Sequence, residues 1–163
     1  MKIILASKSE IRKKILDKYN IANEVMPSNV DEDEFKISLL AQKASPLLIS
    51  KNLAEIKSIK ISTKNPDRIV LGADSVISLN EELINKPNSR EEALEILKKL
   101  NNSKHYLISS VCISKNGAMI WNHSDSSELK MKNMTDIELS AYLAKINTKT
   151  LLAYGVYQIE AGG

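Results

Sequence analysis

The sequence predicts an α/β fold in which helices flank a mixed, twisted β-sheet. In the first half of the chain, short apolar runs typical of buried strands alternate with segments of helical periodicity. In the second half, the strand-like segments HYLISSVCIS (105–114) and AMIWNHSDSSELKM (118–131) flank the turn sequence KNG, which is typical of a hairpin. Alternation followed by a hairpin favours a mixed sheet over a purely parallel one.

The first elements follow from local patterns. KIILA (2–6) is an apolar run typical of a buried strand, and SEIRKKILDKYNI (9–21) has helical spacing. SPLLISKNLAEI (45–56) predicts a helix with Ser45 as its N-cap and Pro46 at its first position. DRIVLGADSVISL (67–79) predicts the clearest strand, interrupted at Gly72.

Two further helices are expected in the second half. NSREEALEILKKL (88–100) gathers its apolar residues on one helical face, with Ser89 or Asn88 as the cap. TDIELSAYLAKI (135–146) begins with Thr135 and Glu138 at the spacing of a capping box. His105 begins a predicted strand, where a structural role and a catalytic role both remain open.

Composition describes an ordinary globular chain. The 163 residues suit one domain, and 43% hydrophobic with 26% charged residues is unlike a disordered tail. The net charge of +3 does not by itself indicate a nucleic-acid partner. The single cysteine, Cys112, excludes an internal disulfide and is expected in the core. No apolar run is long enough for a membrane span or a signal peptide, so we expect a cytoplasmic protein without a membrane partner.

The segment LASKSEIRKK (5–14) is a candidate anion site. Ser7, Ser9 and Arg12 cluster where a strand runs into a helix, and the free N–H groups and dipole of a helix N-terminus favour an anion. Arg12 can offer forked donors to a phosphate. The alternative is that a serine only caps the helix and Arg12 is solvated.

Carboxylates and a lysine form the other candidate groups. VDEDEF (30–35) follows a turn and is interpreted as an acidic loop that either binds Mg²⁺ or Mn²⁺ or is simply solvated. Asp74, within GADS, is costly to bury unless it binds a metal, pairs with a cation or is well hydrogen-bonded. Lys86 precedes Pro87 and is either a phosphate-binding or a surface lysine. Together these groups favour metal-assisted phosphate chemistry, although no Walker loop or zinc motif is present.

The ordered series LASKSEIR, VDE, a helix carrying Lys51, VLGADSV, INKP, EEALEILKKL followed by H, and YQIEAGG resembles the Maf family of nucleoside triphosphate pyrophosphatases. The resemblance implies a cytoplasmic, often dimeric enzyme with a cleft between two lobes. Such enzymes use a divalent metal cation to split a nucleoside triphosphate into the monophosphate and pyrophosphate. Their suggested role is removal of modified or non-standard nucleotides, with a link to cell-division arrest.

The resemblance also implies residue roles. Ser9 and Arg12, with Ser7 beside them, would hold phosphate, as would Lys51 and Lys86. Glu32 would bind the metal, and Asp74 would accept a proton or bind the metal. Ser75 and Glu160 match positions next to the catalytic aspartate and the nucleotide, respectively.

Three departures from the family pattern affect these expectations. Glu10 and Ile11 replace the proline and first arginine of the family's S-P-R-R turn. Ile11 and Glu160 resemble the branch that acts on 7-methyl-GTP more than the branch that acts on dTTP and UTP, and a mixed group shares YQIE and GAD. The chain ends at Gly163, where family members add a strand and a helix. The alternative function is therefore a nucleotide-binding or cell-division-regulating protein with impaired turnover.

Overall fold

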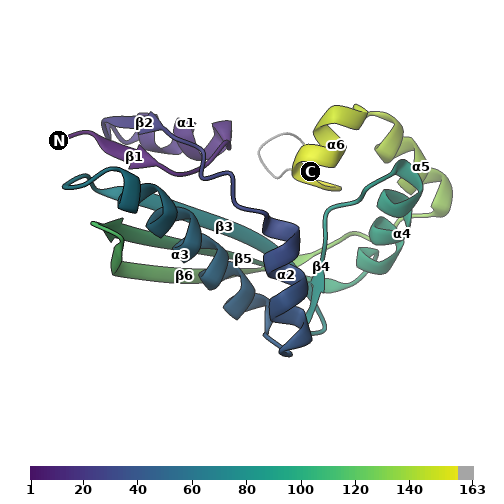
Figure 1. Ribbon diagram of the computed structural model, residues 1–163. Coiled ribbons are helices and arrows are strands. Elements are labelled where there is room, and N and C mark those ends of the chain that lie inside the picture. Colours follow the sequence, from purple (N-terminus) through teal and green to yellow (C-terminus); the bar gives the residue numbers. More distant parts are fainter. Residues whose placement is uncertain (158–163) are drawn as a thin grey trace. The chain divides into compact units, whose positions relative to one another are not determined.

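The computed structural model describes residues 1–157, which form six strands and six helices (Figure 1). The strands are β1 (Ile3–Leu5), β2 (Asn23–Val25), β3 (Val70–Leu79), β4 (Glu82–Ile84), β5 (Lys104–Lys115) and β6 (Ala118–Lys130). The helices are α1 (Glu10–Lys18), α2 (Glu32–Ala41), α3 (Pro46–Lys64), α4 (Arg90–Leu100), α5 (Asp136–Ala144) and α6 (Thr148–Tyr154).

The sheet is mixed, as the sequence predicts. Its strand order is β2-β1-β3-β5-β6, with β4 paired to β3. β1 is parallel to both neighbours, and Ile4 is in register with Val70 of β3, whereas β4 runs antiparallel to β3. Asn116 and Gly117 both have positive φ, as a tight hairpin turn between β5 and β6 requires.

Side-chain caps start the expected helices. Ser9, Ser45 and Ser89 each accept a hydrogen bond from a backbone N–H in the first turn of α1, α3 and α4. Thr135 and Glu138 form the predicted capping box at α5. These helix starts are therefore confirmed, although α3 continues to Lys64, beyond the segment that the pattern predicts.

The acidic run is not a loop, and that interpretation was wrong. Asp31 is the N-cap of α2, where its side chain accepts a hydrogen bond from Glu34 N, and residues 32–34 form the first helical turn. Carboxylates are favoured there because they face the positive end of the helix dipole. The structure also contains β2 and α6, which the sequence patterns did not indicate.

Backbone contacts divide the chain into two compact units. The first comprises Met1–Val76 and Ile108–Ser126, and the second comprises Ile77–Leu107 and the chain from Ser127 onward. In the first unit Ile4, Ala6, Ile61 and Val70 form an aliphatic cluster. The second unit has its own core, which α4, α5 and α6 build mainly from leucine side chains.

Two further expectations concern single features of the chain. Cys112 is buried on β5, which confirms it as a core residue. None of the helices within residues 1–157 has the length and apolar character that crossing a membrane demands.

Candidate active site

The first unit contains a buried ion pair between strand β3 and helix α3. Asp74 and Lys57 are each 5% exposed, and Lys57 Nζ donates to Asp74 Oδ1 at 2.8 Å. Lys57 Nζ also lies 2.8 Å from Glu32 Oε1, on the first turn of α2. A buried carboxylate is stable only when it is well paired, and here one ammonium group joins two carboxylates.

Helix α3 packs unusually closely on β3, and Gly72 permits this approach. A Cβ atom at position 72 would lie 2.2 Å from the backbone oxygen of Ala54, a distance no real contact allows. Ser50 Oγ donates to the Asp74 carbonyl at 3.2 Å, and Ser58 Oγ lies 2.7 Å from Ser114 Oγ on β5. Small side chains at this interface thus bring Lys57 within reach of Asp74.

The loop before α2 determines where Glu32 lies. Lys60, one turn beyond Lys57 on α3, donates from Nζ to the Asn29 carbonyl at 2.9 Å. Asp31 then caps α2, which starts the helix at Glu32. The Glu32 side chain is 40% exposed, so this carboxylate borders solvent while Asp74 lies beneath it.

Arg12 approaches the same strand from helix α1. Its Nη1 donates to the Ala73 carbonyl at 2.8 Å and to Ser7 Oγ at 3.1 Å, and its Nη2 contacts Ser75 Oγ at 3.5 Å. Ser75 Oγ in turn lies 3.0 Å from Ser109 Oγ on β5. The guanidinium is therefore fixed against the residues on both sides of Asp74.

The charges in this cluster influence one another. Burial raises the pKa of Asp74 above its ordinary value, while the cations Lys57 and Arg12 act in the opposite direction. Burial likewise lowers the pKa of Arg12, and the carboxylates of Asp74 and Glu32 act against that effect. An arginine keeps its proton under all ordinary conditions, so Arg12 remains a fixed positive charge beside Asp74.

The residues present fit a divalent cation that arrives with an anionic ligand. Asp74 Oδ2 is buried and has no hydrogen-bond partner among the described residues. Within residues 1–157 there is no group of three or more metal-binding side chains that could form an all-protein site. Mg²⁺ is ordinarily held by one or two carboxylates with the remaining ligands from phosphate and water, and Asp74 with Glu32 supplies those two carboxylates.

The structure brings several of the sequence-predicted residues together. Asp74, Glu32, Arg12, Ser7 and Ser75 belong to one cluster through the contacts given above. Ser9 borders this cluster as the N-cap of α1, with its Oγ accepting from Arg12 N at 3.4 Å. Ile11, in the first turn of the same helix, is half-buried.

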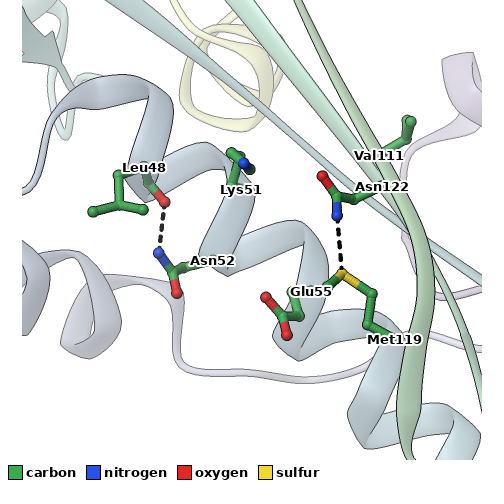
Figure 2. Close-up of a pocket in the computed structure, with 7 residues that line it drawn as sticks. All are labelled: Leu48, Lys51, Asn52, Glu55, Val111, Met119 and Asn122. Atoms are coloured by element: carbon green, nitrogen blue, oxygen red, sulfur yellow. Dashed lines mark hydrogen bonds between the residues drawn. The ribbon is translucent and has the colours of Figure 1, made fainter.

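The contacts given above do not include three of the predicted residues. Lys86 is exposed between β4 and α4 in the second unit, and Glu160 lies outside the described residues. Lys51 lines a separate pocket with Val111, Met119 and Asn122 of β5 and β6, as Figure 2 shows. Lys51 stays a predicted phosphate ligand, and the lysine of α3 that pairs with Asp74 and Glu32 is Lys57.

Two members of the cluster, Lys57 and Ser109, were not predicted from the sequence. A helical pattern did contain a signal for Lys57, because Ser50, Ala54, Lys57 and Ser58 recur at helical spacing among the buried residues of α3. A lysine on the buried face of a helix needs a carboxylate partner, and Asp74 is the buried candidate. Ser109 had no comparable signal, because its link to Ser75 depends on strand register.

The site thus places a buried carboxylate beside a lysine and an arginine on a mixed α/β sheet, and these two cationic side chains are the ones that proteins use to bind phosphate. Over residues 2–163 the chain matches the family described as Maf-like protein, and it belongs to that family. A protein of Pelagibacter ubique (strain HTCC1062) named nucleoside triphosphate pyrophosphatase is 63% identical over 161 residues, which are 99% of this chain and 83% of that protein.

A more distant relative and a solved structure are also similar to this chain. A Brucella abortus biovar 1 (strain 9-941) protein named 7-methyl-GTP pyrophosphatase is 31% identical over 163 residues, which are 100% of this chain and 82% of that protein. Among solved structures, a HAM1 protein from Coxiella burnetii superposes with a TM-score of 0.50 at 17% identity, covering 78% of this chain and 71% of that one. This structural similarity supports the mixed α/β fold.

Proposed function

We propose that the protein is a nucleoside triphosphate pyrophosphatase, which hydrolyses a nucleoside triphosphate to the monophosphate and pyrophosphate. The observation that carries the proposal is the Asp74 cluster: a buried carboxylate, flanked by Lys57 and Arg12, with one oxygen that has no hydrogen-bond partner within residues 1–157. Membership of the Maf-like family and the names of its relatives in Pelagibacter and Brucella support the same reaction.

The N-terminus of α1 is the proposed phosphate-binding element. Its first-turn N–H groups and helix dipole favour an anion, and Arg12 adds a fixed positive charge beside Ser7. Ser9 orders this turn by capping it. Lys86 and Lys51 stay proposed phosphate ligands on the family resemblance alone.

Asp74 is the proposed base. Burial raises its pKa, and a carboxylate with a raised pKa takes a proton from water more readily at neutral pH. Water then forms a new P–O bond, the bridging P–O bond between the α and β phosphates breaks, and pyrophosphate leaves with the electron pair. The proton passes from water to Asp74 Oδ2 and then to solvent, so the reaction is balanced.

A divalent cation, Mg²⁺ or Mn²⁺, is the proposed cofactor. Asp74 and Glu32 would hold it, and when bound it would neutralise phosphate charge. The nucleobase of the substrate is proposed to be modified or non-standard. 7-Methyl-GTP is one candidate, because Ile11 replaces the first arginine of the family's S-P-R-R turn. A homodimer, a cytoplasmic location and the absence of a nucleic-acid partner stay predictions.

A panel of nucleoside triphosphates tests the proposal. Pyrophosphate release is measured with Mg²⁺ or Mn²⁺ for common, methylated and deaminated nucleotides. The parent chain and Asp33→Asn, a neighbouring exposed acid on α2, should turn over the preferred nucleotide, and Asp74→Asn should not. If the parent chain binds nucleotides but hydrolyses none, the protein is instead a binding or regulatory protein and the enzymatic proposal is wrong.

A further inference from the structure

The position between Asp74 and Glu32 is already occupied by a cation of the chain itself. Lys57 Nζ lies 2.8 Å from one oxygen of each carboxylate, which uses two of its three N–H groups. These are the two carboxylates that fit a divalent cation. An ammonium group and a metal ion cannot occupy the same space, so either one or the other bridges the two acids.

Charge balance favours the ammonium while no nucleotide is bound. Asp74 and Glu32 contribute two negative charges, and Lys57 and Arg12 contribute two positive charges that act on Asp74. The buried Asp74 carboxylate is thus already compensated by cations of the chain, without a divalent cation. A metal ion that took the place of the Lys57 ammonium without an anion would replace one positive charge with two, next to Arg12, which is fixed by its bonds to Ala73 and Ser7.

A triphosphate reverses this balance. Its negative charges would offset a divalent cation, and its oxygens are good acceptors for a displaced lysine. Lysine is suited to such a movement because its charge is at the end of a flexible four-carbon chain, whereas the guanidinium of Arg12 is held by three partners.

We propose that Lys57 holds the metal position between Asp74 and Glu32 in the nucleotide-free protein, so that a divalent cation enters only together with the triphosphate. The inference rests on the proposed function for the identity of the anion. The exclusion of the metal by Lys57 in the free protein follows from the contacts of the chain itself.

The test measures Mn²⁺ binding to the full chain without any nucleotide, from the loss of the free Mn²⁺ signal in electron paramagnetic resonance. Lys57→Met should bind Mn²⁺ at least about tenfold more tightly than the parent chain, because it removes the competing charge. Lys64→Met removes an exposed lysine from the last turn of the same helix and should bind like the parent. The double variant Lys57→Met with Asp74→Asn should lose the tighter Mn²⁺ binding expected of Lys57→Met alone.

Equal or weaker Mn²⁺ affinity in a folded Lys57→Met protein would overturn the inference. Circular dichroism checks folding, and if Lys57→Met folds only when Mn²⁺ is added, the metal has replaced the ammonium and the inference is supported. If it is unfolded in both conditions, Lys57→Gln decides by the same affinity criterion. Because no nucleotide is present, this result is independent of the turnover panel that tests the proposed function.

Discussion

Gly72 of β3 lies directly against the backbone oxygen of Ala54 in α3, with no room for a side chain between them. A Cβ atom there would be 2.2 Å from that oxygen and 2.8 Å from Ser58 N. The obstacle is backbone, which a rotamer change cannot relieve. This contact therefore controls how closely α3 and its residue Lys57 approach Asp74.

Gly72→Ala should consequently separate α3 from β3. We expect a loss of about 1 to 3 kcal/mol in the free energy of unfolding, the usual cost of overpacking, measured by urea denaturation. Pyrophosphatase activity should fall further than stability explains, because the Lys57–Asp74 contact lengthens. Ser58→Gly should not rescue the variant, since Ala54 is the nearer obstacle. A variant with parent stability and activity would contradict the close-packing account.

Glu32→Gln tests the second carboxylate. The variant keeps the shape of the side chain but removes the charge that faces Lys57 Nζ. We expect a lower kcat and a need for more Mn²⁺ to reach half-maximal rate, because one of the two proposed metal ligands is weakened. Asp33→Asn, on the exposed side of the same turn, is the matched control. Equal effects of both substitutions would show a general charge effect instead.

Arg12→Ala tests the anion site. The substitution removes the charge beside Asp74 and the bonds to Ala73 and Ser7. We expect triphosphate binding to weaken by about 1.5 to 3 kcal/mol, the usual range for a lost charge-assisted hydrogen bond. Lys14→Ala, an exposed position on α1, should bind like the parent in calorimetric titrations. Unchanged affinity in Arg12→Ala would limit this residue to a structural role.

His105 gives a pH dependence of stability in the second unit. Its Nε2 lies 3.0 Å from Tyr157 Oη, and burial lowers the pKa of His105 below 6.5. The unfolded chain therefore binds a proton first as pH falls, and stability should drop below pH 6.5 until the folded-state pKa is reached.

Urea denaturation between about pH 7.5 and about pH 5 measures this effect, with a slope of at most about 1.4 kcal/mol per pH unit from one proton. His105→Gln should flatten the slope, whereas His123→Gln, on exposed β6, should not. An identical slope in the parent and His105→Gln would mean that other groups cause the dependence.

Local signals in the sequence were sufficient for most of the fold. The caps at Ser45 and Thr135, the KNG turn and the apolar run around Val70 are short-range patterns, and each specifies its element directly. The acidic run VDEDEF was interpreted as a loop because an aspartate such as Asp31 is common both in loops and at helix N-caps. β2 has only three residues, too few to show a period.

The site residues likewise include some that local sequence patterns indicate and others that only the tertiary structure brings together. Arg12 and Asp74 could be singled out because charged groups interrupt apolar patterns near predicted element ends. The helical spacing of α3 contained a signal for Lys57, but its pairing with Asp74 depends on which strand that helix face meets, and this contact is visible only in the structure. Ser109 meets Ser75 across neighbouring strands, and such a contact depends on tertiary structure.

The central claim is that the Asp74 cluster directs hydrolysis between the α and β phosphates of a nucleoside triphosphate. Phosphorus-31 NMR of the products, with the preferred nucleotide and Mg²⁺, tests it most directly. The account predicts pyrophosphate and nucleoside monophosphate from the parent chain and from Asp33→Asn, and neither product from Asp74→Asn. Orthophosphate with nucleoside diphosphate, or unchanged product formation by Asp74→Asn, would contradict it.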